Sequence, residues 1–122
     1  MDDTLIDSFI NYLRATKTKS ENTTKAYAED ISQFLEYLKQ KKLSEPVLIN
    51  INHLHIRGFL AHLRDRKLSR RTVARKLSTL RSFYKYLTVE GLIKQNIAKA
   101  VHAPKTSKRL PLFLYPQEIE AL

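Results

Sequence analysis

Apolar residues return every three or four positions along most of the chain, which is the spacing of an amphipathic helix. The first such stretch begins near Thr4, whose hydroxyl can cap a helix, and ends near Ala15. The second begins at Ser20 or Asn22 and runs to about Lys41, which makes it the longest predicted helix. Its apolar stripe consists of Tyr27, Ile31, Phe34, Leu35 and Leu38.

The stretch that follows, LSEPVLININ, loses the helical spacing and contains Pro46, so it is predicted to be a loop. Asn52 can then cap a third helix over residues 53–66. The residues expected to bury one side of this helix are Leu54 or Ile56, with Phe59, Leu60 and Leu63.

Ser69 can cap a fourth helix, which runs to about Thr88 and is stopped at Gly91. Successive residues of a helix advance by about 100°, so the apolar residues of this segment form one stripe. The stripe consists of Val73, Leu77, Leu80, Tyr84 and Leu87. The opposite side carries Arg71, Arg75, Ser78, Ser82 and Lys85, and its flanks carry Arg70, Lys76 and Arg81.

The chain after the fourth helix is predicted to contain three further parts. A short fifth helix is expected over residues 96–101. The segment HAPKTSKRLPLF that follows is basic, contains two prolines and has no acidic residue, as in an extended linker. Pro116 then opens another helix. We therefore expect a first domain over residues 1–102, a linker over 103–114 and the start of a second domain over 115–122.

The charge of the chain is unevenly distributed. Of its 122 residues, 22 are Lys or Arg and 12 are Asp or Glu, a formal net charge of +10. Residues 1–50 hold 7 basic and 8 acidic residues, whereas residues 51–122 hold 15 basic and 4 acidic. The segment from Ser69 to Leu87 has six basic residues and no acidic one. A solvated helix face would usually mix both signs, so this pattern favours a polyanionic partner, above all nucleic acid.

Three long runs of the sequence resemble one protein family. They are SENTTKAYAEDISQFLEYL, LHIRGFLAHLRDRKLSRRTVARKLSTLRSFYKYL and NIAKAVHAPKTSKRLPLFL. In this order they are similar to the N-terminal core-binding domain of tyrosine recombinases of the Xer-like and phage-integrase branch. The resemblance implies an all-α fold, a small orthogonal SAM-like bundle of four to five helices, that forms one half of a clamp around DNA. The partners it implies are double-stranded DNA, the catalytic domain of the same chain and other recombinase protomers.

The resemblance also implies where DNA is bound. By position, the candidates on the second helix are Thr23, Thr24 and Lys25, and those on the fourth are Arg70, Arg71, Thr72, Arg75 and Lys76. Lys105, Lys108 and Arg109 are candidates on the linker. The family's catalytic residues belong to the domain that follows, so none is expected among these 122 residues. Taken alone, Thr23 and Thr24 are better explained as capping and exposed residues, and only together with the basic fourth helix do they become candidates for DNA contact.

Other chemistries find little support in the sequence. No cysteine is present, and His53, His55 and His62 cannot all lie on one side of a helix, so no metal site is expected. With two glycines there is no glycine-rich phosphate loop, and no cofactor is expected. The N-terminus does not resemble a signal peptide, and no membrane span is visible, so a cytoplasmic location is expected. Two alternatives stay open: a self-sufficient helix-turn-helix regulator and a helical protein-interaction module.

Overall fold

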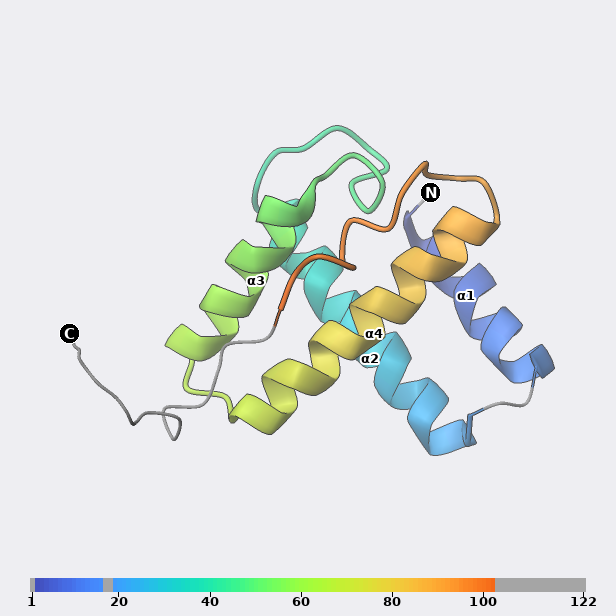
Figure 1. The fold of residues 1–122 in the computed structure, drawn as a ribbon, viewed down its shortest axis with the longest axis horizontal. Helices are drawn as coiled ribbons and strands as arrows, with labels where there is room; N and C mark the ends of the chain where they lie inside the picture. Colours follow the sequence, from blue (N-terminus) through green and yellow to red (C-terminus); the bar gives the residue numbers. More distant parts are fainter. Residues whose placement is uncertain (1, 17–18, 103–122) are drawn as a thin grey trace.

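The computed structural model describes residues 2–16 and 19–102, and these residues form an all-α domain (Figure 1). Its four helices are α1 (Asp2–Thr16), α2 (Glu21–Lys39), α3 (His53–Asp65) and α4 (Arg70–Val89). Helices α2 and α4 cross at the centre, with α1 and α3 on opposite sides of the crossing. The predicted orthogonal bundle and four of its helices are thereby confirmed, and the proposed linker and the start of a second domain lie outside the described residues.

The helix boundaries follow local hydrogen-bonding chemistry. Ser20, Asn52 and Ser69 are the N-caps of α2, α3 and α4, and each side chain accepts a hydrogen bond from a backbone N–H of the first turn. At the other end of α4, Gly91 has a φ of 79°, a conformation that glycine adopts without steric cost. The largest difference from the prediction is at the first boundary, because α1 begins at Asp2 and Thr4 lies inside it. The prediction that the second helix is the longest is wrong, because α2 ends at Lys39 and has 19 residues whereas α4 has 20.

The core is a continuous apolar cluster to which all four helices contribute. The whole predicted stripe of α4 is buried in it, and Phe83 of the same helix packs edge-on against Phe9 of α1 with ring centroids 5.4 Å apart. In α3, Ile56 is fully buried whereas Leu54 is 57% exposed, which resolves the choice left open by the sequence. Gly58 lies so close to the Tyr37 hydroxyl of α2 that an added Cβ would be 2.8 Å from it.

The loop between α2 and α3 is part of the core rather than a loose connection. Val47 and Leu48 are buried, and the Asp2 carboxylate of α1 accepts hydrogen bonds from both of their backbone N–H groups, at 3.1 and 2.9 Å. The Tyr84 hydroxyl donates to the Leu48 carbonyl at 2.6 Å. Burial, together with the negative charge of Asp2, raises the pKa of Tyr84 well above its usual value. This loop therefore connects the start of α1 to the C-terminal half of α4.

The prediction of a fifth helix over residues 96–101 is wrong. Residues 97–100 form a turn, in which the Asn96 side chain accepts from the Ala98 N–H at 2.9 Å and donates to the Arg81 carbonyl at 3.2 Å. Arg81 in turn donates to the carbonyls of Ala98 and Val101. Because this stretch is held by contacts with α4 and is too short to supply the bonds of a regular helix, it stays a turn.

Candidate nucleic-acid interface

The N-terminal ends of α2 and α4 lie along the same edge of the molecule, at the bottom of Figure 1. Both begin with the same sequence arrangement, a capping serine followed three residues later by threonine. The Ser20 hydroxyl accepts from the Thr23 N–H at 3.1 Å and donates to the Thr23 hydroxyl at 2.9 Å. Ser69 does the same with Thr72, at 3.1 and 3.0 Å. Thr23 and Thr72 are therefore capping residues that remain partly exposed.

Four of the predicted residues lie on the exposed or partly exposed surface of the first two turns of α2 and α4. Thr23 precedes Asp30 of α2 by seven residues, so both lie on the same side of that helix. Arg75 of α4 donates to the Asp30 carboxylate across the helix contact, and Arg71 lies one turn before Arg75. We call this surface the α2–α4 face, and it consists of Thr23, Arg71, Thr72 and Arg75.

Lys25 and Arg70 are exposed but point away from the α2–α4 face. Lys25 precedes Asp30 by five residues and Arg70 precedes Arg75 by five, which turns each about 140° around its helix. They therefore lie outside the α2–α4 face, toward the far sides of their helices. Lys105, Lys108 and Arg109 lie outside the described residues.

Beneath the face, the Asp30 carboxylate holds α2 and α4 together. Its side chain is 1% exposed, and Oδ1 accepts from Arg75 Nη2 and from Lys76 Nζ, both at 2.8 Å. Oδ2 accepts from the Thr79 hydroxyl at 2.8 Å. Lys76 Nζ also donates to Gln33 Oε1. Two cations and a hydroxyl thus satisfy one buried acid, which is the condition under which such an acid is tolerated in a core.

Two predicted contact residues are buried, so the expectation that they face outward is wrong. Lys76 is 4% exposed, because α4 is covered by its neighbours not only along the predicted stripe but also along a second one formed by Lys76, Thr79 and Phe83. Thr24 is 1% exposed, and its hydroxyl donates to the Ser20 carbonyl at 3.1 Å. A helical wheel locates the centre of a buried side but not its width, which depends on the neighbouring helices.

Sequence reasoning also missed Asp30, the residue on which the two helices meet. The only signal was an aspartate on the side of α2 next to Ile31 and Phe34, where a carboxylate needs a partner. One sequence alone does not reveal that the partner is 45 residues further along the chain.

Two of the three histidines of α3, His55 and His62, have structural contacts. His55 Nδ1 accepts from the Asn52 N–H at 3.1 Å, which completes a reciprocal cap at the start of the helix. The His62 ring lies 5.3 Å from that of Tyr37. Among residues 2–16 and 19–102, no three side chains of the metal-binding types gather into a site. Within the same residues no helix is long and apolar enough to cross a membrane.

The crossed helices, with capped starts of α2 and α4, form a small SAM-like helical domain. The chain belongs to the family of phage integrase N-terminal SAM-like domains, whose family model matches residues 6–91.

Similar proteins include three tyrosine recombinases of the XerC type. The one from Oceanobacillus iheyensis is 43% identical over 117 residues, which cover 96% of this chain and 38% of the relative. The one from Listeria welshimeri is 41% identical over 118 residues, with 97% and 39% covered. The one from Staphylococcus aureus is 39% identical over 117 residues, with 95% and 38% covered. The chain thus spans less than two fifths of the length of these relatives.

Proposed function

We propose that this chain is the DNA-binding, non-catalytic half of a tyrosine recombinase and that it grips duplex DNA with the α2–α4 face. The observation that carries the proposal is the exposed pair Arg71 and Arg75, one turn apart on α4, of which Arg75 is held against the middle of α2 by the Asp30 contact. Arginine is suited to this task because its planar fork matches phosphate oxygens and guanine edges.

The residues around the two arginines favour insertion of the helix starts into a groove of the DNA over contact with the DNA backbone alone. Thr23 and Thr72 are small and polar, so they allow the backbone of each helix to approach closely. The helix N-termini add partial positive charge beside them. Lys25 and Arg70, which are exposed on the far sides of the same helix starts, would add positive charge rather than direct contacts in the groove. Thr24 and Lys76 are left out of this contact because their side chains are buried.

The proposal also covers the linker and the catalytic domain of the full-length protein. Lys105, Lys108 and Arg109 would follow the phosphate backbone from a linker into the catalytic domain. That domain would carry the reaction of strand exchange, with other protomers bound to the same site. The similarity to XerC-type tyrosine recombinases over nearly the whole of this chain supports this role.

A salt titration tests the proposal. The chain is titrated into a labelled duplex that carries an inverted-repeat recombination site, and fluorescence anisotropy is measured at several salt concentrations. With about five phosphate contacts, the slope of log K against log salt should be near −4.5. Lack of binding at low salt, or binding without salt dependence, would contradict the proposal. Tight binding to an acidic protein, with indifference to DNA, would favour the protein-interaction module instead.

A further inference from the structure

We propose that Asp30 is a positioning residue for DNA binding, which acts by holding the Arg75 guanidinium in place on the α2–α4 face before DNA arrives. The inference rests on the proposed function and adds to it a residue that does not itself contact DNA. It follows from the geometry of Asp30, from the charge of its cluster and from the exposure of Arg75.

Asp30 is fixed more firmly than an ordinary surface carboxylate. Both of its oxygens are engaged, Oδ1 by Arg75 and Lys76 and Oδ2 by Thr79. Rotation of the carboxylate would break all three contacts at once. The carboxylate is therefore a rigid anchor, and its position is set by two helices rather than one.

Arg75 is held at one end and open at the other. Its Nη2 donates to Asp30 at 2.8 Å, whereas half of its side chain, 50%, remains exposed. A guanidinium has five N–H donors in a fixed fork, so one edge can bind the carboxylate while another meets a phosphate or a base. Lysine at this position would have no such second planar edge.

Lys76 explains why the anchor does not cancel the charge of Arg75. An aspartate paired with Arg75 alone would leave a neutral pair on the DNA-facing surface. Lys76 is buried and binds the same oxygen, so the cluster of Asp30, Arg75 and Lys76 keeps one net positive charge. Since the side chain of Lys76 is only 6% exposed, Arg75 is the member of the cluster through which that charge reaches the surface.

A held arginine binds more tightly than a free one, because the rotamer freedom of its long side chain is lost on folding rather than on binding. Immobilising a side chain of this kind at an interface weakens affinity by about three- to tenfold. Release of Arg75 from Asp30 should therefore weaken DNA binding by about that factor.

The variant that tests this is Asp30→Asn with Lys76→Met. It removes one negative and one positive charge, so the net charge stays at that of the native chain, and Arg75 is retained. Simple electrostatics predicts unchanged binding, since one negative and one positive charge are lost from the same place. A positioning role for Asp30 predicts instead that the variant binds DNA more weakly than the native chain. The matched control is Arg14→Gln with Glu21→Gln, which removes the exposed ion pair between α1 and α2 and should leave the affinity within about twofold.

A mutant cycle, in which the substitutions at Asp30 and Lys76 are made in the native chain and in Arg75→Ala, shows whether Asp30 acts through Arg75. In the Arg75→Ala background, the substitutions at Asp30 and Lys76 should cause no further loss of affinity. An equal loss in both backgrounds, or no loss in the native one, would overturn the proposal. If Asp30→Asn with Lys76→Met folds poorly in a thermal melt, Thr79→Val serves instead. It frees Oδ2 without changing any charge and should weaken binding in the same direction by a smaller factor.

A second measurement does not depend on DNA. Nitrogen relaxation of the Arg75 Nε in the free protein should show a restricted side chain in the native chain and a mobile one in Asp30→Asn with Lys76→Met. An Arg75 that is equally mobile in both would refute the anchor. If the native chain fails to bind DNA at all, the proposed function falls, whatever the relaxation data show.

Discussion

Asp30 and Lys76 form an ion pair of 2.8 Å across the crossing of α2 and α4, with side-chain exposures of 1% and 6%. Their charges are removed from water, so each depends on the other and on the groups around them. A buried pair of this kind adds little net stability compared with apolar residues of the same volume, but loss of one partner leaves an uncompensated charge. This asymmetry gives the first prediction.

Asp30→Asn should lower the free energy of unfolding by about 3 to 5 kcal/mol, because Lys76 then stays buried without its carboxylate. The further substitution Lys76→Met should restore most of the loss. Urea unfolding of the native chain, the two single variants and the double variant measures this coupling. The exposed pair Arg14 and Glu21 serves as the control, with a coupling of about 0 to 1 kcal/mol. Additive effects at Asp30 and Lys76 would contradict the prediction.

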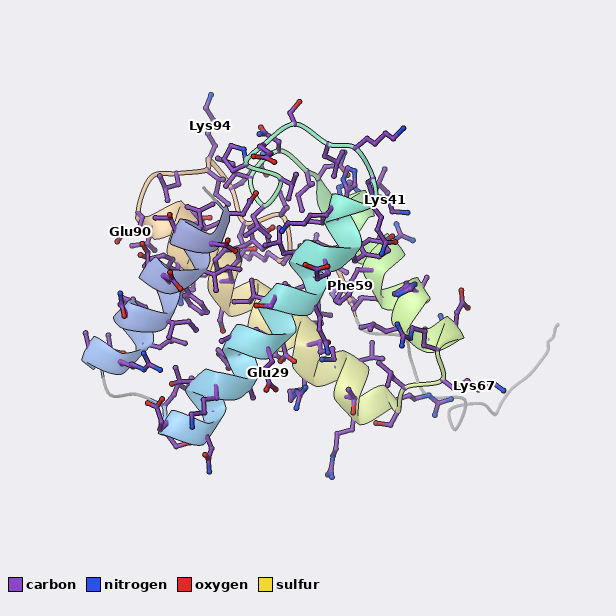
Figure 2. All side chains as sticks on the ribbon, turned by 180° about the vertical axis from the view of Figure 1, so that it is seen from behind. Glu29, Lys41, Phe59, Lys67, Glu90 and Lys94 are labelled. Atoms are coloured by element: carbon purple, nitrogen blue, oxygen red, sulfur yellow. The ribbon has the colours of Figure 1, made fainter. Side chains whose placement is uncertain are left out.

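Arg71→Ala should weaken DNA binding and reduce the magnitude of the salt slope by about 0.9, the share of one phosphate contact. Its stability should be nearly unchanged, because the side chain is exposed and lies away from the core. Lys94→Ala is the matched control: Lys94 is also exposed and lies at the opposite end of the molecule from the starts of α2 and α4 (Figure 2). A loss of affinity as large in Lys94→Ala would mean that binding depends on net charge rather than on the α2–α4 face.

Ser69→Ala should destabilise the fold by about 1 kcal/mol, since the Thr72 N–H loses its hydrogen-bond partner at the start of α4. Ser20→Ala should do the same at α2, whereas Ser69→Asp should retain the cap. Thermal unfolding followed by circular dichroism measures all three. An alanine variant as stable as the native chain would show that the capping contact contributes nothing.

Tyr84 should make stability depend on pH in the alkaline range. Its pKa is raised in the folded state, from an ordinary value of 10.0, so the folded chain holds the phenol proton more tightly than the unfolded chain. The resulting stability is fully present below pH 10 and is lost as the pH rises toward the folded pKa. At pH 11 the loss should be about 1.4 kcal/mol relative to pH 7.

Tyr84→Phe isolates this contribution. The variant should be less stable than the native chain at pH 7 by about 1 to 3 kcal/mol, because the buried Leu48 carbonyl loses its donor. Its stability should then fall less steeply than that of the native chain between pH 9 and 11. Denaturant unfolding of both proteins across this range makes the comparison, and parallel pH profiles would argue against Tyr84 as the titrating group.

The sequence by itself determined the four helices, the caps of α3 and α4 and the main buried stripe of α4. These features depend on neighbours within a few residues: Ser69 needs only Thr72, and Val73 and Leu77 are one turn apart. It also determined the family resemblance, since that depends on the order of residues along the chain. The fifth helix was wrong because Asn96 and Arg81, 15 residues apart, hold that stretch in a turn.

Only the tertiary structure decided which cations face outward and what holds them. Arg75 and Lys76 are adjacent in sequence and carry the same charge, yet one is half exposed and the other is buried. The difference arises because α2 covers one flank of α4 and brings Asp30 to it from 46 residues away. Local sequence fixes the direction in which a side chain leaves its helix. The packing of a second helix then determines whether that direction leads to water or to a buried partner.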